Sequence, residues 1–335
     1  MSERAEIGAL VALVAGALST GGASMLVRLT ETGPTAAAFW RGCLALPLLA
    51  IWALVDSRGE AAPREPRDAE RQNARLPAEA RLRRGSAGLV GLFAGFRDPG
   101  FLLAGAYFAG DLALWHWSLL LTSVAASTLE ASLAPLVVIL FAWLRWKERP
   151  SARFLGATLL AFVGLLLVVS PKFSKGGSAF LGDALGLGTA CFYAAYIVAV
   201  ARLRARYSTG VVMFNSTMVF TVMLLPLGLT QKFLPDDLSG WAALAGCAVA
   251  AQTLGQGLIA YALAHLRPTF SSLGLLLQTL GAAASAWLVL GERLAAIQII
   301  GALVIVGAIT LARSARNAAP AASPAMPQSL GVVRD

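Results

Sequence analysis

The chain has 335 residues, of which 57% are hydrophobic and 13% are charged, and its mean hydropathy is +0.70. Soluble globular domains carry about 45–50% apolar and about 25% charged residues, so this composition excludes an ordinary soluble domain and indicates a membrane protein with several spans. The formal net charge of +9 would favour nucleic-acid binding in a soluble chain, but here we attribute it to basic loops at a membrane surface and expect no nucleic-acid partner.

Ten apolar segments along the chain reach the length of roughly 20 residues that a membrane-spanning helix needs. The first begins after a short charged N-terminus, 1–6, and has no convincing cleavage site, so we expect it to be retained. The ten segments are 7–29, 34–55, 100–121, 124–144, 153–171, 180–201, 210–230, 240–262, 269–290 and 294–312.

Most Lys and Arg residues fall on one side of this ten-span topology. The longest connection, 56–99, holds nine Arg and four Pro and is predicted to be a solvated linker attracted to anionic lipid. The tail 313–335 is rich in Ala and Pro and is predicted to be disordered. Because Lys and Arg collect on the cytoplasmic side of membrane proteins, we expect both termini in the cytoplasm.

A block near the middle of the chain returns 144 residues later. Ala142-Trp143-Leu144 with Glu148-Arg149 reappears as Ala286-Trp287-Leu288 with Glu292-Arg293. The early segments repeat at an offset of 174, because loop 56–99 is longer than its counterpart. Each copy therefore holds five spans, 7–171 and 180–312. An odd number forces the second copy to enter the membrane from the other side, which predicts an inverted-topology repeat around a central site.

The ends of the two copies resemble the EamA family of the drug/metabolite transporter superfamily. Leu290-Gly291-Glu292-Arg293 before Ile300-Gly301-Ala302, and Glu148-Arg149 before Leu155-Gly156-Ala157, look like the ends of EamA repeats. Arg41 looks like the arginine of the family's second helix, and Pro135 like the proline of its fourth. The chain departs from the pattern at Lys147, where the usual Leu-Gly is missing, and at Thr279, which replaces the second proline.

The resemblance implies an all-α membrane protein with ten transmembrane helices in two inverted five-helix repeats around a central cavity. It implies a secondary transporter that moves amino acids or related metabolites across the bacterial inner membrane. Among the branches, the chain looks most like the aromatic amino acid exporters. The alternatives are a nucleotide-sugar or multidrug exporter of the same fold and, less favoured, a membrane-embedded enzyme. The expected partners are a small-molecule substrate and the lipid bilayer, and the expected assembly is a monomer.

Polar groups inside spans are costly and mark cavities or helix contacts. For Arg41 we weigh binding of a substrate carboxylate against a structural role, and favour the structural one. Pro135 is assigned to structure or gating, like Glu148 and Glu292, whose carboxylates are expected to cap the helices that follow.

The third and fourth spans offer acidic side chains. Asp111, Trp115 and Ser118 recur at i, i+4 and i+7 and so share one helix face, which would suit an amino group and an apolar side chain. Glu130, in the fourth span, could pair with a substrate ammonium or carry a proton; a solvent-facing position near the boundary is the alternative.

Amides and hydroxyls of the other spans complete the predicted lining. Such groups bind zwitterions without a fixed charge, and hydrogen bonding between helices is the alternative role. The predicted residues are Ser19, Tyr193, Tyr196, Gln252, Gln256 and Gln278.

Motifs for enzymatic chemistry are missing from the sequence. There is no HExxH, no Gly-rich phosphate loop before a helix and no credible serine triad. The three cysteines lie inside apolar segments at spacings that suit neither a metal site nor disulfides. We therefore expect a transporter without catalytic residues, metal or cofactor.

Overall fold

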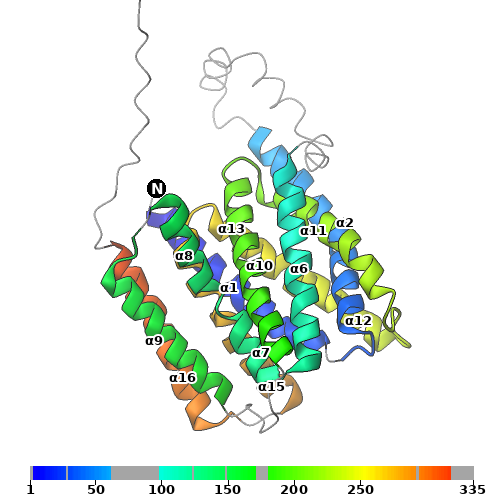
Figure 1. Ribbon diagram of the computed structural model, residues 1–335. Coiled ribbons are helices and arrows are strands. Elements are labelled where there is room, and N and C mark those ends of the chain that lie inside the picture. The colour runs from blue at the N-terminus through cyan, green and yellow to red at the C-terminus, as the bar shows by residue number, and fades with distance from the viewer. Residues whose placement is uncertain are drawn as a thin grey trace, which may run out of the picture.

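The computed structural model describes residues 3–27, 29–61, 98–122, 124–147, 149–170, 180–291 and 294–317. Within these ranges every regular element is a helix (Figure 1). The helices are α1 (Glu3–Val27), α2 (Pro34–Ala61), α6 (Pro99–Leu121), α7 (Val124–Ala131), α8 (Ala134–Trp146), α9 (Ala152–Val169), α10 (Phe180–Arg204), α11 (Thr209–Gly228), α12 (Leu238–Cys247), the π-helix η3 (Ala248–Gln256), α13 (Gly257–Leu263), α14 (Pro268–Gly274), α15 (Leu277–Leu290) and α16 (Ala296–Asn317).

Nine helical segments of the described residues are long and apolar enough to cross a membrane. They correspond to nine of the ten predicted spans, with α7–α8, α12–η3–α13 and α14–α15 each forming one segment. The third predicted span corresponds to α6, which has 23 residues but is not among the nine. The all-helical membrane fold is confirmed, and the number ten stays a prediction.

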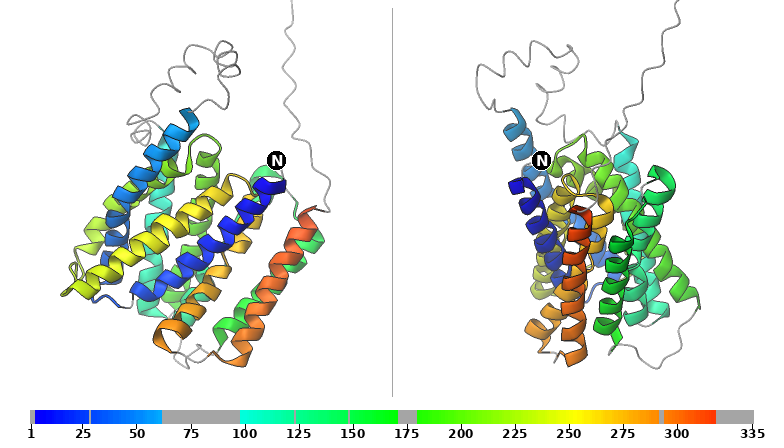
Figure 2. Two further views of the ribbon diagram at one scale, coloured as in Figure 1. Left: turned by 180° about the vertical axis from the view of Figure 1, so that it is seen from behind. Right: turned by 90° about the vertical axis from the view of Figure 1, so that its left-hand side faces the viewer.

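The two copies interleave rather than forming separate bundles. α9 packs against α16, α2 against α11, α6 against α10, and α1 against the α12–η3–α13 segment, so each main contact joins a helix of one copy to a helix of the other. Neighbouring contacts close a ring in the order α14–α15, α1, α12–η3–α13, α2, α11, α6, α10 and α7–α8. The α9–α16 pair lies beside this ring (Figures 1 and 2).

Exchanging each helix with its counterpart in the other copy leaves this pattern of contacts unchanged, as an internal two-fold axis requires. The start of α1 and the ends of α2 and α16 lie on the same side of the bundle, at the top of Figure 1. We call this side the N-terminal side. α8 ends on it, whereas its counterpart α15 ends on the opposite side (Figure 1). The two copies therefore run in opposite senses, as predicted.

The C-caps of α8 and α15 show the repeat at the level of single residues. Lys147 has φ 58° and Gly291 has φ 64°, and their amides reach the carbonyls of Ala142 and Ala286. The left-handed cap is thus kept in both copies, although only the second has the glycine that adopts it without strain.

Glycines allow the closest helix crossings. A Cβ on Gly210 of α11 would lie 2.4 Å from the Ala53 amide nitrogen of α2, and a Cβ on Gly21 of α1 would lie 1.9 Å from the Gln278 carbonyl oxygen of α15. In membranes, such contacts supply the van der Waals packing that holds helices together.

Several predictions fall on residues that the structure does not describe. The linker prediction concerns mainly residues 62–97, and the tail prediction mainly 318–335. The predicted caps Glu148 and Glu292 also lie outside the described residues. All of these stay predictions.

Candidate functional site

A cavity of about 550 Å³ lies inside the ring of helices. Its lining comes mainly from the second halves of α1 and α6, the first half of α2, the π-helix η3 and the two broken helices α7–α8 and α14–α15. The first half of α10, the end of α9 and the start of α16 complete it. α1 and α6 run in the direction opposite to α2, so the second halves of α1 and α6 lie at the same depth in the bundle as the first half of α2. The cavity is therefore displaced towards the side of the bundle opposite the N-terminal side.

One cation and one carboxylate face this cavity. Arg41 enters from α2 and Asp111 from α6, where the Asp111 side chain is 9% exposed. They do not form a direct ion pair, and the Arg41 Nε and Nη2 atoms are buried without a hydrogen-bond partner among the described residues. The guanidinium carbon instead lies 5.4 Å from the centre of the Phe108 ring. Two buried charges that lack direct neutralisation are expensive in a membrane, which marks them as candidates for ligand contact.

The α6 stripe supplies the aromatic wall of the cavity. Phe108, Asp111 and Trp115 follow each other at helical spacing and all line it, as the same-face argument predicts for the latter two. Ser118, one turn further on, is fully buried outside the lining. The cavity ends before it, which periodicity alone does not reveal.

Amide and hydroxyl groups face Arg41 and Asp111 from the second copy. The Gln278 amide donates to the Tyr193 hydroxyl at 3.0 Å, which links α15 to α10 across the cavity wall. The Gln256 carboxamide oxygen is buried and has no hydrogen-bond partner within the described part of the chain. These three predicted residues therefore lie together and present both donors and acceptors to a ligand.

Irregular helices place these groups. Gln278 is the second residue of α15, directly after the break at Leu275–Leu276, and Pro135 lines the cavity at the corresponding break of α7–α8. Gln256 is the last residue of η3, a nine-residue π-helix. π-Helical turns occur frequently at functional sites, and half-helix starts carry unpaired amides and a positive dipole end.

Five predicted lining residues lie elsewhere. The Ser19 hydroxyl donates to the Ala250 carbonyl at 2.7 Å, the Gln252 amide donates to the Thr217 hydroxyl at 2.9 Å, and Tyr196 stacks on Phe108 with ring centres 4.5 Å apart. Glu130 lies over Gly186 of α10, where an added Cβ would come within 1.9 Å of its Oε2 atom. Together with Ser118, these side chains serve helix packing, the alternative weighed for several of them, and a binding role for them stays untested.

Other polar lining residues were not predicted. They are Thr20, Thr128, Ser132, Thr189, Ser272, Thr279, Gln298 and His116. Gln298 already has partners, because its amide donates to the Val168 carbonyl at 3.1 Å and its oxygen accepts from the Ala295 amide. A polar residue in an apolar span was the available signal, but short hydroxyls occur at too many positions to be singled out.

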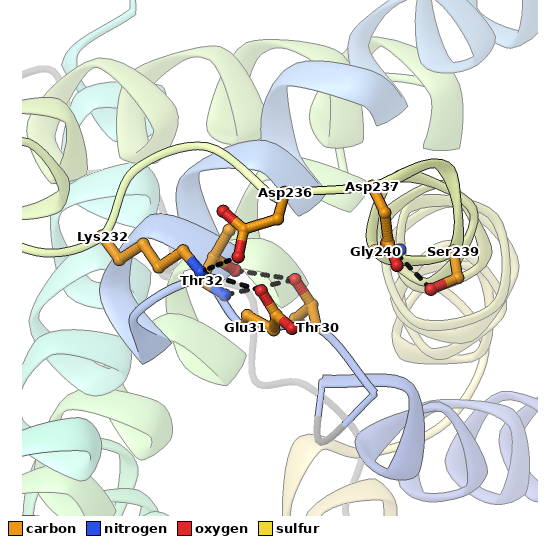
Figure 3. Close-up of polar contacts among 8 residues, drawn as sticks. All are labelled: Thr30, Glu31, Thr32, Lys232, Asp236, Asp237, Ser239 and Gly240. Atoms are coloured by element: carbon orange, nitrogen blue, oxygen red, sulfur yellow. Dashed lines mark hydrogen bonds and ion pairs between the residues drawn. The ribbon is translucent and has the colours of Figure 1, made fainter.

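A polar cluster on the opposite side ties two loops together near the cavity end (Figure 3). Lys232, after α11, pairs with Glu31 at 2.8 Å and with Asp236. These hydrogen bonds, the one to Asp236 above all, raise the pKa of Lys232. Thr32 of the first loop also lines the cavity. Because all three charged groups are exposed, we assign the cluster to loop positioning.

On the N-terminal side, side-chain contacts hold neighbouring helices together. Arg204 of α10 donates through Nε to the Ala260 carbonyl of α13 at 3.1 Å, and the Tyr207 hydroxyl donates to Asp98 at 3.2 Å. Phe101 and Tyr207 pack with ring centres 4.9 Å apart. The described conformation thus has its cavity towards one side and packed side chains on the other.

Comparisons with known proteins agree with this architecture. The family described as EamA-like transporter family matches residues 6–170 and 180–314, one match for each copy. Two pseudopaline exporters, from Pseudomonas aeruginosa strains UCBPP-PA14 and PAO1, are each 27% identical over 65% of this chain and 76% of the relative. A solved crystal structure aligns with a TM-score of 0.69 over 93% of this chain and 98% of its own, at 18% identity, which shows a shared fold. These relatives support the family, and they do not single out the aromatic amino acid exporters.

Proposed function

Because this chain belongs to the EamA-like transporter family, we propose that it exports a small amphoteric metabolite, an amino acid or an amino-acid derivative, across the bacterial inner membrane. In this proposal both termini are cytoplasmic, and the substrate binds in the central cavity. Transport follows alternating access around that site.

The observation that carries the proposal is the separated pair of charges in one cavity. Arg41 presents buried donors without hydrogen-bond partners among the described residues, and the Asp111 carboxyl group lines the same cavity. A substrate with a carboxylate and an ammonium group would neutralise both at once. Charge-assisted hydrogen bonds of this kind are roughly twice as strong as neutral ones. The cavity thus supports a substrate-binding role for Arg41, rather than the structural role favoured from the sequence.

The other lining residues determine which uncharged groups of the substrate fit the cavity. Phe108 and Trp115 offer apolar surface, while Gln256, Gln278 and Tyr193 offer neutral polar groups. The volume of about 550 Å³ lies within the roughly 300–1,000 Å³ of small-molecule sites. We therefore include bulky neutral amino acids, the aromatic ones among them, in the proposed substrate class.

The competing proposal is a nucleotide-sugar or multidrug exporter of the same fold. A diphosphate substrate requires several cationic side chains, but Arg41 is the single Lys or Arg among the described lining residues, and Asp111 lies in the same cavity. A hydrophobic drug would leave both charges unpaired. The amphoteric substrate fits the lining better than either.

The test is transport by protein reconstituted into liposomes, with a panel of labelled amino acids and amino-acid derivatives that includes acidic, basic and aromatic members. Arg41→Gln and Asp111→Asn should each raise KM for the transported compound at least tenfold, because each removes a charge-assisted hydrogen bond. Arg267→Gln, an exposed arginine outside the cavity, is the matched control and should leave KM unchanged. Absence of flux for the whole panel, or equal KM in all variants, would reject the substrate class.

Proton coupling is tested separately. Flux is measured with and without a pH gradient for Asp111→Asn and Glu130→Gln. If Asp111 carries the coupling proton, its variant should lose gradient-driven flux and keep exchange at equal pH. If both variants respond to the gradient like the unchanged protein, coupling through these carboxyls is excluded; if the gradient has no effect on any of the proteins, transport is facilitated diffusion.

A further inference from the structure

A second hollow lies on the outer surface of the bundle, apart from the central cavity. It has a volume of about 600 Å³ and shares no lining residue with the central cavity. α6 and α8 each pack against α10, which lies between them (Figure 1), so α10 forms the floor and the other two form the walls. We call this hollow the lateral groove.

The lateral groove is apolar along most of its length and opens towards the surroundings of the bundle. Its walls carry Leu103, whose side chain is 50% exposed, Val137 and Phe141. Small residues of α10, Ala195 and Ala199 among them, keep its floor low. In a membrane this surface meets lipid chains rather than water.

The lateral groove is cationic at one end only. Arg202, in the last turn of α10, and Arg206, just beyond it, line this end on the N-terminal side. The Arg202 guanidinium lies 5.8 Å from the centre of the Phe141 ring, and the Arg206 side chain is 76% exposed. Asp98 also lines this end, where it caps the Gly100 amide at 2.8 Å and lies 3.9 Å from the exposed Arg206, a distance at which an ion pair is weak.

The length of the groove matches one leaflet of the membrane. Along α10, the lining runs from Cys191 to Arg202, eleven residue steps that rise by about 16 Å. The hydrocarbon core of a bilayer is about 30 Å thick, so this distance is about half of it. The cationic end therefore suits the headgroup of a lipid at the membrane surface, and the apolar groove suits one acyl chain that reaches towards the midplane.

We infer that the lateral groove binds an anionic phospholipid, with the phosphate at Arg202 and Arg206 and one acyl chain between α6 and α8. Basic pockets between membrane helices are known binding sites for anionic headgroups. One wall of the groove is α8, the half-helix that begins at the cavity and carries Pro135. A bound lipid would therefore contact this half-helix. The inference does not depend on the identity of the transported substrate.

Native mass spectrometry and thermal unfolding of the detergent-purified protein test the inference, with phosphatidylglycerol and phosphatidylcholine of identical chains as probes. Phosphatidylglycerol should be retained preferentially and raise Tm. Each arginine near a membrane surface contributes about a fivefold preference, so Arg202→Ala with Arg206→Ala should remove most of it. Arg267→Ala, an exposed arginine that does not line the groove, is the charge-matched control and should keep the preference.

A second variant and a second probe separate the alternatives. Ala199→Phe fills the floor without changing charge and should also reduce lipid retention. Inorganic phosphate alone should not raise Tm; equal stabilisation by phosphate would mean an anion site and would overturn the inference. Equal retention of both lipids by the unchanged protein, or an unchanged preference in the double variant and in Ala199→Phe, would overturn it as well.

Discussion

The α2–α11 pair and the two broken helices, α7–α8 and α14–α15, are opposite solutions to packing around the same cavity. α2 and α11 are continuous, and each is capped at its start by a side chain of the other or of the loop beyond it. The Gly210 amide donates to Asp56 at 2.9 Å at one end, and the Thr35 amide donates to Gln231 at 3.0 Å at the other. The broken helices have no side-chain cap where α8 and α15 begin.

We therefore call the α2–α11 pair the fixed axis of the bundle and the two broken helices its deformable side. One capped backbone amide at each end of the α2–α11 pair holds the two helices in register. Sliding one helix along the other would break these hydrogen bonds, and unpaired amides of a first helical turn are costly in lipid. The breaks in α7–α8 and α14–α15 border the cavity. The second break forms without a proline, because Thr279 occupies the position that corresponds to Pro135. We expect the cavity to open and close by movement about the α2–α11 pair. The moving parts would then be the neighbouring groups of the ring, which mix helices of both copies, rather than the two sequence halves.

The largest expected effect is at the glycine of the fixed axis. Gly210→Ala would place a Cβ within 2.4–2.7 Å of backbone atoms of α2, which have no room to move, and should cost about 3 kcal/mol of stability. Thermal unfolding in detergent measures this. Gly156→Ala in α9 meets nothing within 4 Å and should be neutral or stabilising. Similar Tm values for the two variants would show that the axis is not tightly packed.

A matched change on the deformable side should act on transport. Gly21→Ala brings a Cβ within 1.9 Å of the Gln278 carbonyl and pushes α15 away from α1, with a cost of about 2 kcal/mol. Because Gln278 and Gly21 line the cavity, KM should rise several-fold while the folded fraction changes less than in Gly210→Ala. A variant that loses stability but keeps its KM would place the substrate away from α15.

The end caps of the axis should have smaller and independent effects. Asp56→Ala and Gln231→Ala each leave an amide of a first helical turn without its partner, which should cost about 1 kcal/mol each. The two sites lie at opposite ends of the pair, so the double variant should show the sum. Thermal unfolding of the single and double variants is the measurement, and strong non-additivity would argue against two separate caps.

The smallest expected effect compares the two left-handed C-caps. Lys147→Gly removes the strain of a left-handed backbone, about 1 kcal/mol, and should raise Tm, whereas Gly291→Lys should lower it by a similar amount. Unfolding midpoints in detergent check both. Changes of Tm in opposite directions would confirm that the two copies use the same cap. Changes in the same direction would contradict the correspondence of these two positions.

Sequence and structure agree best where the argument used periodicity within one helix. Asp111 and Trp115 line the cavity together, as their spacing on α6 predicts. Ser118 shares that face but lies beyond the end of the cavity, because spacing fixes direction and leaves depth open. Tyr196 and Gln252 were also predicted to line the cavity, but both contact neighbouring helices instead.

By itself, the sequence determined that this is a helical membrane protein built from two inverted copies. Apolar length and the offset of 144 residues are properties of the chain, and no packing can change them; the odd number of spans per copy was predicted from them. Only the tertiary structure decided which helices interleave, where α14–α15 breaks without a proline, and that Arg41 and Asp111 share one cavity unpaired. These features arise between segments that are distant in the sequence or depend on how closely two backbones approach, and local sequence carries neither kind of information.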